Sequence, residues 1–193
     1  MLAVATFSSV KSANRSARTA ERALLAGQRP VLVPSRDDDA PERVRFGDGQ
    51  MLVVPGHGAA LELANDNIYM AIALRNGGTG LAVIHGWRAR VMERTDSVRP
   101  DVNEFRRQQR DLYIPAGDTG FWQGAIREHD DSDYDALRAA AERRQRVRVD
   151  LLYGDHEGGQ RTISRFSIAE WEQVEGERSE VLRYWNLDRE DPR

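Results

Sequence analysis

Asp155, His156 and Glu157 stand together in the segment YGDHEGGQR at 153–161. An imidazole between two carboxylates could transfer protons or bind a metal ion. The segment is rich in glycine, however, and lies between two runs that alternate as β-strands do, and adjacent residues of a hairpin loop point in different directions. The sequence therefore favours a polar hairpin that offers these three side chains as binding contacts, and it identifies no catalytic residue here.

A second acidic segment, HDDSDYDALRAAAE at 129–142, has carboxylates at the first, third, fifth and twelfth positions of a calcium-binding loop: Asp131, Asp133, Asp135 and Glu142. The sixth position of such a loop needs glycine, but here it is Ala136, and no helix precedes the segment. Acidic residues also favour a helix N-terminus, where they compensate the helix dipole. The segment thus predicts the start of a helix, and we expect neither a metal ion nor a cofactor.

The glycine run NGGTG at 76–80 raises the question of a phosphate-binding loop. Such a loop needs a helix after it, whose N-terminal amides face the anion. The residues after Gly80 alternate with a period of two, which predicts a strand. NGGTG is therefore predicted to be a turn between strands, with Asn76 as a candidate binding contact at the end of the domain.

Trp122 follows Phe121 in the segment GDTGFWQG, in a run that alternates as a strand does. The first interpretation is that Trp122 belongs to the hydrophobic core. The alternative is an exposed aromatic platform that, together with Asp118, Asp155 and His156, would serve a carbohydrate-binding or hydrolytic sandwich. No GxSxG or HExxH motif supports catalysis.

The composition limits the classes of protein to which the chain can belong. It has 193 residues, a net charge of −3 and no cysteine, which excludes disulfides, thiolate metal sites and cysteine nucleophiles. A nucleic-acid-binding domain usually has a clear positive excess, so this class is disfavoured. No run approaches the roughly 18 apolar residues that span a bilayer, and the start MLAVATFSSV lacks the features of a signal peptide. We expect a cytoplasmic protein, either free or peripheral to the membrane.

Residues 2–27 are predicted to form an amphipathic helix, within an arm at 1–29. One narrow stripe has alternating spacings of three and four residues: Val10, Ala13, Ala17, Ala20 and Leu24. An alanine-rich stripe buries little area, so the helix needs something to pack on. We expect it to extend and pair with a helix of a second copy or of a protein partner, with Arg15, Arg18 and Arg22 facing solvent or anionic headgroups. The alternative is that it folds back over its own domain.

Residues 30–193 are predicted to form one mainly β domain, an immunoglobulin-like antiparallel β-sandwich with one inserted short helix. Strand patterns begin near Val44, and MLVV at 51–54 is closed by PGHG. Further strands are expected at 31–33, 68–75, 81–91, 111–114, 119–126, 147–153, 161–168 and 181–187. The helix is expected at 133–145, with Ser132 and Asp135 as a start resembling a capping box.

The segments IALRNGGTGLAV and LYIPAGDTGFW resemble those of bacterial immunoglobulin-like sandwiches, including CARDB-like adhesion modules. The chain also looks like uncharacterised bacterial proteins, many from actinobacteria, which have N-terminal membrane helices, an Ala/Arg-rich helix ending in Q-x-RPVLV, and a sandwich. That pattern is matched by residues 17–33 and by Tyr153, Gly154, Asp155 and Gly159. The composition is also similar, since Lys11 is the only lysine among 28 basic residues. The resemblance implies a membrane anchor only if the natural start lies upstream, and it brings no catalytic residues.

The leading functional hypothesis is a non-enzymatic binding module with protein partners. Sandwiches commonly bind through end loops and sheet edges, so NGGTG, PGHG and DHEGG are candidate contacts.

Overall fold

The computed structural model of the chain describes residues 2–93, 97–171 and 174–190. Its helices are α1 (Leu2–Gly27), α2 (Tyr134–Glu142) and the short 3-10 helix η1 (Val102–Glu104). Its strands are β1 (Leu32–Pro34), β2 (Glu42–Arg45), β3 (Met51–Val54), β4 (Ala59–Ala64), β5 (Asn67–Asn76), β6 (Ala82–Val91), β7 (Arg106–Ile114), β8 (Thr119–Ile126), β9 (Val147–Gly154), β10 (Thr162–Trp171) and β11 (Val174–Asn186).

The strands form two main antiparallel sheets that face each other. In the first sheet, β5 pairs with β8 along one edge and with β4 and then β1 along the other. The second sheet has the order β11-β10-β9-β6-β7. Just before β4, His57 O accepts the N–H of Ser179 in β11 at 3.3 Å, and between β7 and β8, Gln108 Nε2 donates to Gln123 O at 3.1 Å. The sheets therefore meet along both of their edges.

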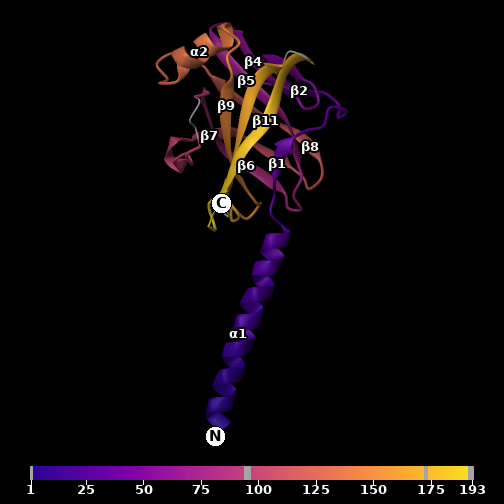
Figure 1. The fold of residues 1–193 in the computed structure, drawn as a ribbon, viewed down its shortest axis with the longest axis vertical. Coiled ribbons are helices and arrows are strands. Elements are labelled where there is room, and N and C mark those ends of the chain that lie inside the picture. The colour runs from indigo at the N-terminus through magenta and orange to yellow at the C-terminus, as the bar shows by residue number, and fades with distance from the viewer. Residues whose placement is uncertain (1, 94–96, 172–173, 191–193) are drawn as a thin grey trace.

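The main core lies between the two sheets because alternate residues of each strand point inward. Ile72 and Leu74 from β5 pack there with Leu151 from β9 and Phe166 from β10. Trp87 and Trp122 contact each other edge to face, with ring centroids 5.5 Å apart. The helix α2 adds the buried Leu137 and Ala140 and covers the end of the sandwich opposite the arm (Figure 1).

Two further apolar clusters lie on the outer faces of the sheets. The β2–β3 hairpin places Val44, Phe46 and Leu52 against Tyr69 and Ala71 on the outside of the first sheet. On the outside of the second sheet, Leu152, Ile163 and Trp185 are covered by Val102 and Phe105. The sandwich is thus thickened on both sides, and the segment around η1 becomes part of the second sheet's outer face.

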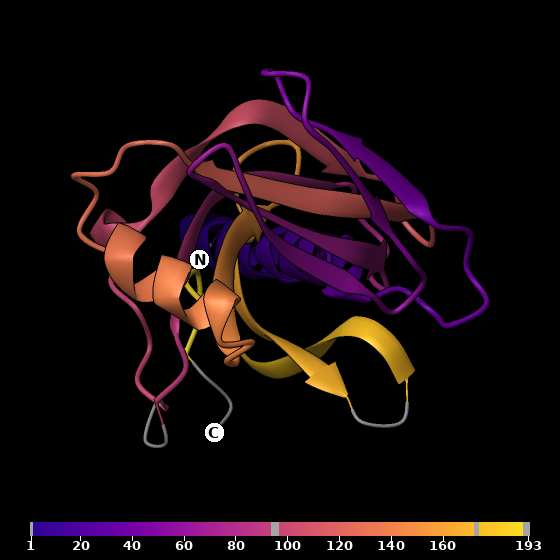
Figure 2. The same cartoon turned by 90° about the horizontal axis from the view of Figure 1, so that it is seen from above.

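The helix α1 extends away from the sandwich and lies over neither sheet, as the two perpendicular views show (Figures 1 and 2). Its 26 residues span about 39 Å at the usual rise per residue. Within the part of the chain that the structure describes, no helix is long and apolar enough to cross a membrane.

The predicted fold class, a mainly β antiparallel sandwich with an N-terminal helix and one inserted helix, is confirmed. Several boundaries differ. Strand β4 was not expected, β7 and β11 are longer than their apolar patterns, and α2 starts at Tyr134 and ends at Glu142. The capping box at Ser132 is wrong, because the N-cap is Asp133 and its side chain makes no capping hydrogen bond. That carboxylate binds Arg90 and Arg106 instead.

Candidate interaction site at the arm root

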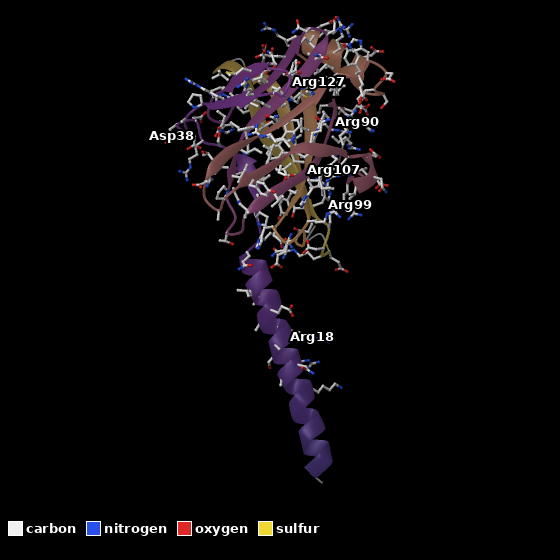
Figure 3. All side chains as sticks on the ribbon, turned by 180° about the vertical axis from the view of Figure 1, so that it is seen from behind. Arg18, Asp38, Arg90, Arg99, Arg107 and Arg127 are labelled. Carbon is white, nitrogen blue, oxygen red and sulfur yellow. The ribbon has the colours of Figure 1, made fainter. Side chains whose placement is uncertain are left out.

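The stripe on α1 is open to solvent. Ala13, Ala17 and Ala20 are exposed, and Leu24 is 63% exposed. The side chain of Val10 lies outside the described residues, as does that of Arg22. Figure 3 shows Arg18 on the arm at a distance from every strand. The predicted partner-binding residues are therefore accessible along the described part of the helix.

The arm root, residues 27–32, is by contrast tightly bound to the sandwich. The guanidinium of Arg29 donates to Thr162 Oγ1 at 3.2 Å and to Asn186 Oδ1 at 3.1 Å, and it forms an ion pair with Asp188. These partners come from the start of β10 and the end of β11. The first residues after the helix are thus joined to the far end of the chain.

Asn76 binds the arm root from the other side. Its Oδ1 accepts the N–H of Val31 at 3.1 Å and that of Gly78 at 3.0 Å. Its Nδ2 donates to Gly80 O at 2.6 Å and to Ile114 O at 3.0 Å. A fully buried amide that uses both of its polar atoms twice has a structural role.

The glycines of NGGTG are required by the close approach of the arm root. A Cβ at Gly80 would overlap the carbonyl oxygen of Gln28, and a Cβ at Gly78 would overlap that of Arg29. Thr79 donates its hydroxyl to Gly27 O and its amide to Arg29 O. The loop connects β5 to β6 in the opposite sheet, as predicted for a turn, and it also holds the incoming chain.

Tyr153 completes the arm root from inside the sandwich. Its hydroxyl accepts the N–H of Leu32 at 3.2 Å and lies 3.0 Å from Ser164 Oγ. Burial raises the pKa of this phenol, so it stays protonated at neutral pH. The neutral hydroxyl can then donate to Ser164 while it accepts from Leu32.

The Asp155 segment forms the hairpin between β9 and β10, next to the arm root. Asp155 is buried, and its Oδ1 accepts the N–H groups of Glu157 at 3.1 Å and Gly159 at 2.8 Å. His156 and Glu157 are exposed at the tip. The three residues are not brought together as an acid–base or metal site, because the Asp155 carboxylate is directed into its own turn.

His85 on β6 is half-buried near this hairpin. Burial and the charge of Arg161 lower the pKa of its imidazole, while Asp155 acts in the opposite direction. Its Nε2 has no hydrogen-bond partner among the described residues. No group of three or more residues of the described chain could hold a metal ion, and Asp131 and Asp133 of the calcium-like segment bind Arg106.

Two of the predicted contact residues are placed inside the molecule. Trp122 is 0% exposed and packs on Trp87, so it forms no exposed aromatic platform. Asn76 is also 0% exposed and cannot touch an external ligand. The predicted site residues did not include Arg29, Asn186 and Asp188. Nothing in their local sequence patterns shows that segments more than 150 residues apart meet here.

Comparison with family models, with curated proteins and with solved structures finds no match to this chain.

Proposed function

We propose that this protein is a non-enzymatic interaction module, an immunoglobulin-like sandwich held at a fixed angle on a helical arm whose alanine stripe pairs with another helix. The observation that supports this most is the contrast between the arm root and the arm. Residues 27–32 are bound from several sides, whereas Ala13, Ala17, Ala20 and Leu24 are exposed.

Most helical stability in proteins comes from the packing of one face of the helix, so a helix whose stripe packs on nothing lacks its main source of stability. Small residues at heptad-like spacing let two helices approach closely. The charged Lys11, Arg15 and Arg18 lie on the opposite side of α1, where they do not obstruct such pairing.

The proposed partner helix belongs to a second copy of this chain or to a protein partner near a membrane. In the second arrangement the arginines of the arm lie toward anionic headgroups, and the module has a peripheral, cytoplasmic location. The resemblance to CARDB-like modules and to actinobacterial proteins with N-terminal membrane helices is consistent with this proposal. With Trp122 buried, no observation favours the carbohydrate-binding or hydrolytic alternative.

The test changes the stripe and leaves the sandwich intact. The double variant Ala17→Glu, Ala20→Glu should reduce the oligomeric mass in light scattering or, if the parent is monomeric, abolish capture of a crosslinked partner from the native organism. The control Lys11→Glu, Arg18→Glu introduces the same number of glutamates on the opposite side of the helix and should keep the oligomeric mass of a parent that associates with itself.

Deleting residues 1–27 separates the arm from the stability of the sandwich. A truncated protein that melts at the parent's temperature but loses its oligomeric mass or partner supports the proposal. A monomeric parent whose melting temperature collapses on truncation contradicts it, because the helix would then be packing on its own domain.

A further inference from the structure

The loop that holds the arm root contains two neighbouring residues that can react with each other. Asn76 is the only asparagine of the chain that is followed by glycine. In such a pair the backbone nitrogen of the glycine can attack the side-chain amide carbon of the asparagine, because glycine has no Cβ to obstruct the approach. Whether Asn76 and Gly77 react therefore depends on how the fold holds these two groups.

The reaction needs no reagent except water. A bond forms between Gly77 N and Asn76 Cγ, the bond between Cγ and Nδ2 breaks, and Nδ2 leaves as ammonia with the proton of the Gly77 amide. The product is a succinimide ring. Water then opens one of the two C–N bonds of the ring and leaves aspartate or isoaspartate at position 76.

The arm root binds both of the reacting groups, at the point where α1 joins the sandwich beside β1 (Figure 1). Val31 O accepts the N–H of Gly77, the attacking nitrogen, at 2.8 Å. Val31 N–H donates to Oδ1 of Asn76, the amide under attack, at 3.1 Å. One residue of the root thus holds the nucleophile and the electrophile of the reaction at the same time.

The rest of the loop holds the leaving group. Nδ2 of Asn76 donates to Gly80 O at 2.6 Å and to Ile114 O at 3.0 Å. Asn76 is 0% exposed and stands opposite Leu32 in the β1–β5 pair. Ring closure has to break the bonds of Nδ2, and hydrolysis has to bring water to Cγ. Both steps are blocked while Val31 and Leu32 cover the loop.

We propose that Asn76–Gly77 is a spontaneous deamidation site that the arm root protects, and that its modification makes release of the root irreversible. The second part follows from the product. An ionised carboxylate has no proton to donate, and a protonated one has a single donor for two acceptors. The new side chain would therefore oppose the carbonyl oxygens of Gly80 and Ile114, and burying its charge without a partner is strongly unfavourable.

The consequence is a change in the arm that operates in one direction. A root that opens and closes again keeps Asn76 intact, whereas a root that stays open long enough for the reaction loses its main fixed contact. The proposal concerns residues 27–32 and the loop after β5, and it does not involve the stripe of α1. Its failure would leave the proposed pairing of the arm unaffected, and the reverse also holds.

Peptide mapping by mass spectrometry tests the protection. The full chain is kept in a mildly alkaline buffer, native or in denaturant at the same pH, and aspartate and isoaspartate at position 76 are measured against time. The native parent should react on the order of a hundredfold more slowly than the denatured one, since an opening that breaks several hydrogen bonds is rarely populated. Equal rates in the two states would overturn the proposal without the need for any variant.

Arg29→Ala tests whether the root is the protecting element. It removes the ion pair with Asp188 and the bonds to Thr162 and Asn186, and it should accelerate the native reaction about tenfold or more. Arg107→Ala, at an exposed position of β7, is the matched control and should react as the parent does.

Asp150→Ala separates opening of the root from unfolding of the whole sandwich. It breaks the buried ion pairs with Arg88 and Arg165, so it lowers the melting temperature without touching the root. Arg29→Ala should react faster than Asp150→Ala even though it melts at a higher temperature, because the reaction follows the local opening. Reaction rates that follow the melting temperatures instead would show that global unfolding is the route, and the protection by the root would be wrong.

Two variants of the reacting pair complete the test. Gly77→Ala should suppress the reaction in the Arg29→Ala background, and the fold tolerates it because its Cβ would meet only ordinary contacts at 3.8 Å. Asn76→Asp imitates one product, and amide hydrogen exchange at residues 27–32 should be faster in it than in the parent. Unchanged exchange in Asn76→Asp would contradict the irreversible release of the root.

Discussion

Asn76 Oδ1 accepts the amide proton of Val31 at 3.1 Å, and this bond joins the first residues after the arm to the loop that follows β5. The same side chain holds Gly80 and Ile114 through its Nδ2. One buried amide thus fixes three segments of the chain relative to one another.

Replacing Asn76 with alanine should therefore destabilise the protein strongly. The N–H of Val31 and the C=O groups of Gly80 and Ile114 would lose their partner, at a cost of about 1–3 kcal/mol for a group that is left buried and unsatisfied. Urea unfolding should show a loss of about 2–4 kcal/mol. Thr79→Ala removes one bond to exposed Gly27 and should cost much less; equal effects of the two variants would contradict the structural role of Asn76.

Gly80→Ala should disturb the angle of the arm, because a Cβ at Gly80 overlaps the carbonyl oxygen of Gln28. The chain has no cysteine, so spin labels can be attached at Arg18→Cys and Arg107→Cys alone. The distance distribution between the labels should be narrow in the parent background and broad or displaced with Gly80→Ala. Gly77→Ala is a matched control in the same loop, since its Cβ would meet only ordinary contacts at 3.8 Å.

Asp150→Ala should be among the most destabilising single substitutions. It would leave the guanidinium groups of Arg88 and Arg165 buried without their shared carboxylate, and breaking a buried ion pair typically costs about 3–5 kcal/mol. Chemical denaturation measures the loss. Asp118→Ala, at an exposed position, should be nearly neutral, and a comparable loss there would point to a general sensitivity of the fold.

Glu177 should make the stability of the protein fall as the pH rises from about 5 to about 8. Burial raises the pKa of its carboxyl to about 7, and Glu170 and Glu62 add to the shift while the Leu61 N–H and Arg144 oppose it. A folded-state pKa above the unfolded value means that the folded protein binds the proton more tightly, so its stability is greatest below the unfolded pKa and is lost through the folded one.

Glu177→Gln should remove most of this dependence and stabilise the protein above pH 7, by an amount on the order of 2 kcal/mol, because the glutamine oxygen can still accept the Leu61 N–H, a bond of 2.6 Å in the parent. Denaturation midpoints across the pH series provide the measurement. Glu180→Gln makes the same charge change in β11, and its pH profile should follow the parent; a parent profile that is flat in this range would contradict the role of Glu177.

The elements that could be predicted are those with a clear local period. Strand β8 has the predicted bounds 119–126 because its alternate residues point to opposite faces. Strand β4 could not be predicted, since its Ala, Leu and Glu residues are weak strand formers that pair here only because β5 lies beside them. For Phe121 and Trp122 the period gave no direction, as both are apolar: Trp122 belongs to the main core, whereas Phe121 packs against both the main core and the outer cluster of the first sheet.

The candidate site was the least predictable part, because its residues come from distant segments. The predicted turn at NGGTG was correct, but its relation to Gln28 and Arg29 depends on how β1 enters the first sheet. The pairing of Asp150 with Arg88 likewise depends on the β6–β9 register, which a bulge near Gly86 shifts. Neither fact can be read from local composition.

The bound root makes α1 a lever with its pivot at residues 27–32. A tilt of about 10° at this pivot would move the far end of a helix about 39 Å long by about 7 Å. A change as small as one altered contact of Arg29 would therefore be magnified at the distal end of the arm. Conversely, the length of the helix and the angle of its root together set how far from the sandwich, and in which direction, the distal end of the arm lies.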